Sequence, residues 1–420
     1  MKITEITTCR ICGNTNLIPL MDLGLQPLSG IFPEKQAEDP PSSPLQLVKC
    51  NNETNKGACG LVQLKHSVDP GEMFKNNYGY LSGMNQTMTN HLGSITDHIE
   101  HHIKLSEGDT VIDIGSNDGT LLKSYKIKGL FRVGIDPGGE QYKKYYPDNI
   151  QLISDFFPSE QYKGDKAKVI TSIAMFYDLE DPMTFVKSIK ANLHPDGIWV
   201  LEQSYLPDML VNNAFDTICH EHLEYYALAQ IKWMLVKNDL KVIDVETNNT
   251  NGGSFRVYVT HTGSKQPTHI QRISSMERYE NSLKLNTPLQ YTAFYDRVSS
   301  LKNKTLEFIN NEIKKGKSIY VYGASTKGNV LLNYYGLTDK EIVAAADRNS
   351  QKWICKTPGS HIPIISEEDM RKANPDYLLV LPWHFKSEFI EREKDYLNRG
   401  GRIMFPLPYL EIVGTGKHVN

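Results

Sequence analysis

Residues 111–122 read Val-Ile-Asp-Ile-Gly-Ser-Asn-Asp-Gly-Thr-Leu-Leu and carry the strongest fold signal in the chain. The first four residues predict a strand, the glycine-flanked middle predicts a turn, and the end predicts the start of a helix. Gly115 and Gly119 permit a positive φ, and Asn117 is among the few side chains that tolerate that backbone region. A strand, a tight turn and a helix in this order predict one unit of a parallel α/β sheet.

Strands and helices alternate on both sides of this unit. A helix is predicted over residues 87–105, and a polar helical stretch over 266–315. Because the ligand of a parallel sheet lies at the carboxyl ends of its strands, the acid Asp136 at the end of the second strand is a candidate cofactor contact. The predicted strands are 110–114, 131–135, 169–173, 198–201, 241–246 and 254–260.

A second α/β unit is predicted near the C-terminus. Its strand at 318–322 leads into the turn Gly-Ala-Ser-Thr-Lys-Gly at 323–328 and a helix at 329–335. Asp347 follows the next predicted strand, so the turn superficially resembles a dinucleotide fingerprint. Lys327, at the start of the helix, could instead hold a phosphate through the free N–H groups and the helix dipole. A purely structural turn is the other interpretation. Strands are also predicted at 342–346 and 377–381.

Four of the six cysteines lie in the first sixty residues. Cys9-Arg-Ile-Cys12 followed by glycine is typical of a zinc knuckle, because a two-residue spacer lets both sulfurs reach one ion. Cys50 and Cys59 would complete a tetrahedral four-sulfur site, although their eight-residue spacer is longer than usual. Reduced surface thiols are the alternative. A structural zinc is favoured, since a segment this rich in proline and polar residues has little core of its own.

Bulk properties exclude several classes of protein. A length of 420 residues predicts two or three domains. The formal net charge of −3 provides no basic field for nucleic acid, so no nucleic-acid partner is expected. No apolar run is long enough to span a bilayer, and the polar start of the chain does not resemble a signal peptide. The expected location is therefore the cytoplasm, away from membranes, where cysteines stay reduced or bind metal.

Residues 216–226, Asp-Thr-Ile-Cys-His-Glu-His-Leu-Glu-Tyr-Tyr, concentrate acid–base groups. A metalloprotease pattern would need a histidine where Glu224 stands, which argues against a metal site. One interpretation is a satisfied polar network that ties a loop to the sheet. The other is general-base chemistry, in which His222 removes a proton while Glu221 orients its ring or holds a substrate hydroxyl.

The turn at 115–119 resembles the first motif of S-adenosylmethionine (SAM)-dependent methyltransferases. That cofactor has no pyrophosphate, so an acid in the turn, Asp118, is tolerable, and Asp136 is placed to accept the ribose hydroxyls. The expected cofactor contacts are Asp113, Gly115, Asn117, Asp118, Gly119 and Asp136.

The motifs together resemble one family along nearly the whole chain: the nucleotide-sugar C-methyltransferases that make branched deoxysugars, such as the tylosin and tetronitrose 3-C-methyltransferases. The shared motifs, in order, are the four cysteines, the turn at 115–119, the run at 216–226, Asn-Gly-Gly-Ser-Phe-Arg-Val-Tyr at 251–258, the turn at 323–328, Ile-Pro-Ile at 362–364, Pro-Asp-Tyr at 375–377, Pro-Trp-His at 382–384 and Phe-Pro-Leu-Pro at 405–408.

The resemblance implies an α/β chain with three parts: a zinc-binding module at 1–70, a Rossmann-like SAM methyltransferase domain at 71–265, and a Rossmann-like nucleotide-sugar-binding domain at 266–420. It also implies methyl transfer from SAM to C-3 of a 4-keto-deoxysugar nucleotide, often TDP-linked. A monomer or weak homo-oligomer is expected.

Carried over by motif, Glu221 and His222 fall on the catalytic pair of the family. A tyrosine from the segment containing Tyr78 and Tyr80 would donate to the developing oxyanion, and Cys219 stands where other members have a tyrosine. Tyr225, Tyr226 or a water could replace that lost donor, or the enzyme could act on a different acceptor. The expected substrate contacts are His220, Ser325 and Lys327. Three alternatives stay open: O- or N-methylation of a nucleotide sugar, a non-catalytic zinc-containing binding protein, and a nicotinamide oxidoreductase.

Overall fold

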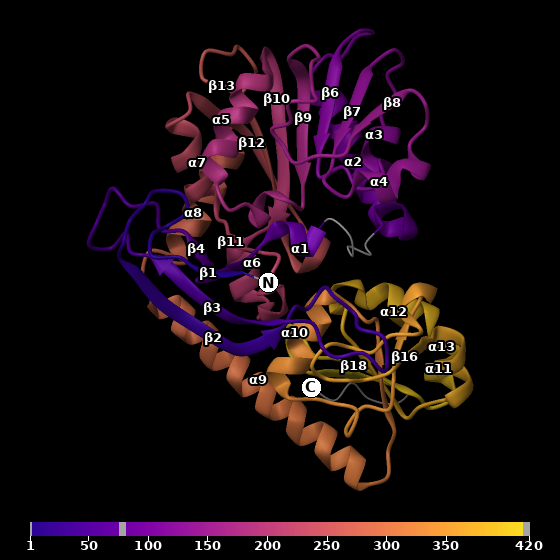
Figure 1. Cartoon of the computed structure of the whole chain (residues 1–420). Coiled ribbons are helices and arrows are strands. Elements are labelled where there is room, and N and C mark those ends of the chain that lie inside the picture. Colours follow the sequence, from indigo (N-terminus) through magenta and orange to yellow (C-terminus); the bar gives the residue numbers. More distant parts are fainter. Residues whose placement is uncertain (1, 75–80, 415–420) are drawn as a thin grey trace.

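The computed structural model describes residues 2–74 and 81–414 (Figure 1). Its largest sheet has seven strands in the order β12-β13-β10-β9-β6-β7-β8. The five strands from β8 to β10 run parallel, β13 is antiparallel to β10, and β12 is antiparallel to β13. In sheet order the strands are β12 (Leu240–Asn248), β13 (Ser254–His261), β10 (Leu193–Ser204), β9 (Ala167–Ile173), β6 (Thr110–Ile114), β7 (Phe131–Ile135) and β8 (Ile150–Ile153).

Both faces of this sheet are buried, which explains why its strands read as nearly continuous apolar runs. Successive side chains of a strand point to opposite faces. Val111 packs under α2 (Gln86–His102) and α3 (Thr120–Lys123), whereas Ile112 packs in the separate core with α5 (Pro182–Asn192), α7 (Leu228–Val236) and α8 (Ile270–Ser282). The helix expected over 87–105 corresponds to α2.

The C-terminal domain repeats this plan with six strands in the order β16-β15-β14-β17-β18-β19. The first five strands are parallel and β19 is antiparallel. In both domains the first strand of the unit, β6 or β14, is the middle one of the five parallel strands, and the chain order reverses next to it. Ligands of open α/β sheets bind at such switch points. The strands are β16 (Ile364–Ser366), β15 (Ala345–Asp347), β14 (Ile319–Tyr322), β17 (Tyr377–Val380), β18 (Arg402–Phe405) and β19 (Glu411–Val413). The prediction of an α/β chain with two parallel sheets is confirmed.

The N-terminal module is more regular than its proline content predicted. β2 (Leu17–Pro27) and β3 (Ser42–Cys50) form a long antiparallel pair, and Pro27 is the last residue of its strand. Pro27 fits there because a terminal residue of a strand can lack an N–H donor. Next to β3 lies β4 (Val62–Leu64), and β1 (Ile3–Glu5) pairs with β5 (His66–Val68).

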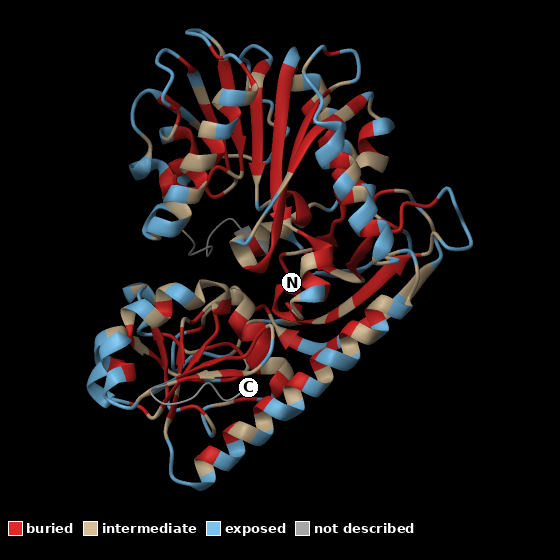
Figure 2. Ribbon diagram, turned by 180° about the vertical axis from the view of Figure 1, so that it is seen from behind, coloured by how far each residue is buried: buried red, intermediate tan, exposed pale blue. Residues whose placement is uncertain are grey.

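The outer strand of this module comes from elsewhere in the sequence. β11 (Glu224–Tyr225), inside the histidine–glutamate run, pairs antiparallel with β4. The polar stretch at 266–315 forms α8 and the 26-residue α9 (Leu289–Lys314), which packs against β2 and α6 (Leu206–Val211). Buried and exposed residues alternate along α9 in Figure 2, because only one stripe of this helix faces the protein. None of the helices in residues 2–74 and 81–414 combines the length and apolarity needed to cross a bilayer.

Candidate active site

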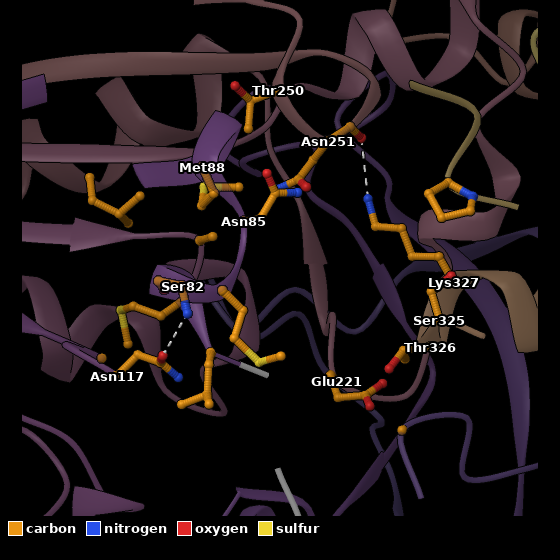
Figure 3. A pocket seen from close by; sticks show the side chains of 18 of the residues that line it. Ser82, Asn85, Met88, Asn117, Glu221, Thr250, Asn251, Ser325, Thr326 and Lys327 are labelled. Atoms are coloured by element: carbon orange, nitrogen blue, oxygen red, sulfur yellow. Dashed lines mark hydrogen bonds between the residues drawn. The ribbon is translucent and has the colours of Figure 1, made fainter. Parts of the chain in front are cut away.

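A cavity of about 1030 Å³ lies between the central and C-terminal domains (Figure 3). One wall is formed by residues at the carboxyl ends of β6, β7, β9 and β10, and the opposite wall by residues after β14, β15 and β17. Asp113, Asp136 and Gln203 belong to the first wall, and Lys327 and Asp347 to the second. The cavity therefore connects the switch point next to β6 with the switch point next to β14. A ligand bound at one of them would face a ligand bound at the other.

The turn after β6 is built as its sequence suggests. Gly115, Asn117 and Gly119 have φ values of +69°, +50° and +71°. Asp136 accepts hydrogen bonds from the backbone N–H groups of Asn117 and Gly138, both at 2.8 Å, and thereby fixes the turn. Burial raises the pKa of Asp136, and these two hydrogen bonds oppose the rise. Each carboxylate oxygen has a second lone pair, so the acid can still accept a ribose hydroxyl from the cavity side.

Two of the expected cofactor contacts, Asp118 and Gly119, lie outside the cavity lining. Asp118 accepts a hydrogen bond from the backbone N–H of Gly83 at 2.7 Å, and Asn117 accepts one from Ser82 at 3.1 Å, as Figure 3 shows for Asn117. Both side chains thus hold the 3-10 helix η1 (Ser82–Met84) against the turn. Asp118 therefore positions η1 in this structure, and its direct contact with the cofactor stays a prediction.

Asp113 lies beneath the turn and faces the cavity. Its carboxyl accepts a hydrogen bond of 2.5 Å from the Thr171 hydroxyl. Burial raises the pKa of Asp113 to about 7, against the lowering effect of this hydrogen bond.

His222 is oriented for use as a base. Its Nδ1 donates to the carbonyl oxygen of Thr217 at 2.9 Å, which fixes the neutral ring with its lone pair on Nε2. The ring packs on Tyr177 with centroids 4.2 Å apart and lines the cavity. Burial, together with the positive charge of Lys327, lowers the pKa of His222 to about 3, so the imidazole is neutral near pH 7. Because Thr217 orients the ring, the first role considered for Glu221, that of orienting it, is wrong.

Glu221 offers an acceptor to the cavity. It lies close to Thr326 (Figure 3) and to Gly30, and its Oε2 is buried without a hydrogen-bond partner among residues 2–74 and 81–414. A side chain at Gly30 would overlap Glu221, since a Cβ there would lie 2.2 Å from Oε1. Burial raises the pKa of Glu221. A buried carboxyl group with an unpaired oxygen is suited to hold a substrate hydroxyl.

Three other residues of the run, His220, Tyr225 and Tyr226, lie outside the cavity lining. His220, expected to contact substrate, instead donates from Nε2 to the carbonyl of Ser43 in β3 at 3.0 Å. Tyr225 and Tyr226, considered as replacement donors, also lie outside the cavity lining, and the hydroxyl of Tyr225 is directed at Thr217. Cys219 does line the cavity, and burial raises the pKa of its thiol well above the ordinary value. Tyr78 and Tyr80 lie outside the described residues.

The C-terminal domain contributes Ser325 and Lys327 to the cavity. Ser325 caps α10 (Thr326–Tyr335) by accepting from the N–H of Gly328 at 3.1 Å. Lys327 extends toward the opposite wall, where its Nζ donates to the carbonyl of Asn251 at 3.2 Å (Figure 3). Its charge also lowers the pKa of His384, in addition to the larger effect of burial. Lys327 therefore spans the two domains beside the base.

Several residues that line the cavity were not predicted from the sequence. Glu202 and Gln203 lie in the last three residues of β10, and this position at a carboxyl end could have identified them. Glu202 is paired with His91 and Arg256, while both polar atoms of Gln203 are buried without hydrogen-bond partners in the described part of the chain. Asp178 had no sequence signal. Burial, together with the charges of Glu221 and Glu224, raises its pKa well above the ordinary value.

The four N-terminal cysteines converge as the spacing predicts. Their sulfurs lie within 4.8 Å of one another, with Cys9 and Cys59 at 3.4 Å and Cys12 and Cys50 at 3.5 Å. Thiolates held tetrahedrally at about 2.3 Å from zinc are about 3.8 Å apart, so the four sulfurs fit that ion. All four positions are filled by protein, which is typical of a structural site rather than a catalytic one.

Replacement of Asp136 by alanine is expected to weaken SAM binding about 10- to 100-fold, because hydrogen bonds to a charged group contribute about 1.5–3 kcal/mol. Titration calorimetry with the purified protein measures this change. Asp148→Ala, an exposed aspartate nearby, is the matched control and should bind SAM normally. Equal affinity of Asp136→Ala and the wild type would remove Asp136 from the cofactor site.

Comparisons with known proteins agree with this architecture. Three family models match successive parts of the chain: "Putative zinc binding domain" at residues 9–74, "Methyltransferase domain" at 93–245 and "C-methyltransferase C-terminal domain" at 249–408. The C-methyltransferase NovU of Streptomyces niveus is 29% identical over 420 residues, covering 98% of each chain.

Two further similarities are partial. A tRNA U34 carboxymethyltransferase of Pseudoalteromonas translucida (strain TAC 125) is 33% identical over 115 residues, 25% of this chain and 35% of the other. The crystal structure of the plantazolicin methyltransferase BpumL with a pentazolic analogue and SAH is 12% identical, covers 43% of this chain and 87% of its own, and has a TM-score of 0.35. Neither bears on the substrate. The three consecutive family matches and the full-length similarity to NovU show that this chain is a SAM-dependent methyltransferase of the C-methyltransferase family.

Proposed function

We propose that the protein methylates C-3 of a TDP-linked 4-keto-deoxysugar through an enolate formed by a side-chain base. The observation that carries this proposal is the placement of His222 and Glu221 in one cavity with the cofactor turn on one wall and Lys327 on the other. The cavity volume of about 1030 Å³ is at the upper end of the range for small-molecule sites, as two ligands together require.

Each of the cavity residues has a separate role in this reaction. Asp113, Gly115, Asn117 and Asp136 would hold the cofactor, which when bound supplies an electrophilic methyl group on a sulfonium. The Nε2 of His222 accepts the C-3 proton, and the electron pair of the broken C–H bond moves onto the 4-keto oxygen. Lys327 places a positive charge near this base, which favours the anionic enolate. Glu221 accepts a hydrogen bond from a sugar hydroxyl. The electron pair on the 4-keto oxygen would then return to C-3, which would bond to the methyl carbon as the methyl–sulfur bond breaks and S-adenosylhomocysteine leaves. His222 would release the C-3 proton to solvent.

Cys219 alters this arrangement relative to the tyrosine of other family members. Because its thiol has a raised pKa, it stays protonated and is only a weak donor. The oxyanion therefore depends on Lys327 and on the segment containing Tyr78 and Tyr80. A monomeric or weakly associating cytoplasmic enzyme with structural zinc is part of this proposal.

Incubation with SAM and a set of nucleotide sugars tests the substrate class. S-Adenosylhomocysteine should form only with a 4-keto sugar, and deuterium at C-3 should wash out into solvent even without SAM if the enolate forms first. NMR of the product should place the methyl group on carbon. A methyl group on oxygen or nitrogen would contradict the proposal.

The rate should depend little on pH on the acid side of neutrality. A histidine with a lowered pKa keeps its lone pair as the pH falls below neutrality. A histidine with the ordinary pKa of 6.5 would instead be half protonated at pH 6.5. With His222 near 3, kcat/KM at saturating SAM should stay flat from about pH 8 to about pH 5. Initial rates of S-adenosylhomocysteine formation measure this profile. Because Asp113 has a pKa of about 7, an acid limb centred near pH 6.5 that is also present in Asp113→Asn would show that the base has an ordinary pKa in the working enzyme.

A further inference from the structure

Arg10, between the zinc ligands Cys9 and Cys12, is turned into the protein. Its side chain is only 3% exposed. Nη1 donates to the carbonyl of Leu64 at 2.7 Å and to Oε1 of Gln63 at 3.3 Å, and the backbone N–H also donates to Oε1 of Gln63 at 3.2 Å. These contacts fasten the zinc knuckle to β4, the strand that pairs with β11 of the histidine–glutamate run.

The guanidinium reaches the run itself. Its Nε lies 3.7 Å from Oε1 of Glu224, whose side chain is fully buried, and 3.5 Å from Oε2 of Glu180, which is 41% exposed. Both oxygens of Glu224 and two nitrogens of Arg10 are buried without hydrogen-bond partners among the described residues. Glu180 stays partly exposed, so Glu224 is the buried acid that faces the guanidinium, and removal of either side chain leaves the facing polar atoms of the other buried without a counterpart.

Further contacts follow the same path from the metal ligands to the run. Gln230 Nε2, at the start of α7, donates to the carbonyl of Cys59 at 3.1 Å. The backbone N–H of Leu64 donates to the carbonyl of Leu223 at 2.8 Å, next to His222. Glu224 is paired in register with Gln63, the residue that Arg10 contacts. The base is thus two residues from a strand that belongs to the sheet of the zinc module.

We propose that Arg10 is a positioning residue: through Glu224 it couples the zinc knuckle to the segment that carries His222, so that the zinc module sets the geometry of the active site. The catalytic consequence rests on the proposed function, whereas the coupling itself does not. A loss of order in residues 217–226 would displace His222, and a displacement of about 1 Å can lower a rate about 10²-fold.

The experiment compares Arg10→Met, Arg10→Lys and Glu224→Gln with the control Arg278→Met, an exposed arginine on α8. Hydrogen exchange by mass spectrometry measures how fast the backbone amides of residues 217–226 exchange, and residues 131–135 serve as the internal reference. Zinc content and the kinetics of the wild-type reaction are measured on the same samples. The exchange measurement needs no substrate. It therefore tests the coupling even if the proposed function is wrong.

Arg10→Met and Glu224→Gln should each accelerate exchange in 217–226 at least about tenfold, leave 131–135 unchanged, and lower kcat more than the KM for SAM. Arg10→Lys should recover part of both effects because it retains the charge. Glu224→Gln leaves the knuckle untouched and should retain its zinc. Wild-type exchange in Glu224→Gln would overturn the proposal, even if Arg10→Met loses its metal.

Discussion

Replacement of His222 by asparagine should lower kcat about 10²- to 10⁴-fold, the range contributed by a positioned general base. Asparagine can still donate to the carbonyl of Thr217, the partner of His222 Nδ1, but it has no basic nitrogen to receive the C-3 proton. SAM affinity should stay within about twofold of the wild type, because the ring of His222 bonds to Thr217 and not to the turn after β6. Single-turnover formation of S-adenosylhomocysteine and deuterium washout at C-3 measure the loss.

A matched control is His101→Asn, at the solvent-exposed end of α2. It should turn over at the wild-type rate. If His222→Asn washes out deuterium as fast as the wild type, another group removes the proton, and the assignment of His222 as the base is wrong.

Replacement of Cys12 by serine should have the largest effect on stability. Structural zinc sites contribute roughly 10–16 kcal/mol of apparent binding free energy in isolated zinc-finger peptides, and that binding free energy is coupled to folding. Loss of one of the four sulfurs should release the ion and unfold the knuckle that contacts β4. The purified variant should contain less than one zinc per chain by elemental analysis and should melt well below the wild type.

Thr8→Ala, an exposed substitution next to Cys9, controls for local changes and should retain both zinc and melting temperature. Wild-type stability of a zinc-free Cys12→Ser protein would show that the cysteine cluster is dispensable for folding.

The fold was predictable where local pattern and burial agree. β6 and β7 have the predicted boundaries, because each is a five-residue strand ended by a turn residue or an acid. The predicted strand at 342–346 was displaced: β15 begins at Ala345, after a turn. β8 and β11 were not predicted, since β8 is short and β11 has a polar sequence that becomes a strand only by pairing with β4.

The site was predictable in its residue types but less so in their partners. The motif predicted that His222 and Glu221 act together, but the ring of His222 is oriented by a carbonyl. His220 contacts Ser43, 177 residues away in sequence, and Asp118 contacts Gly83, 35 residues away. Contacts over such separations depend on tertiary packing, and a single sequence contains no local signal for them.

The pairing of β11 with β4 restricts how this family can exchange parts by recombination. A crossover near residue 70 would join the zinc module of one parent to residues 216–226 of another. The pairing of β4 with β11 and the contact of Arg10 with Glu224 would then be made by residues from different parents. Viable chimaeras should therefore inherit the first 70 residues together with residues 216–230. The ancestry of the metal-binding module is then tied to that of the acid–base chemistry, although about 150 residues separate them in the gene product.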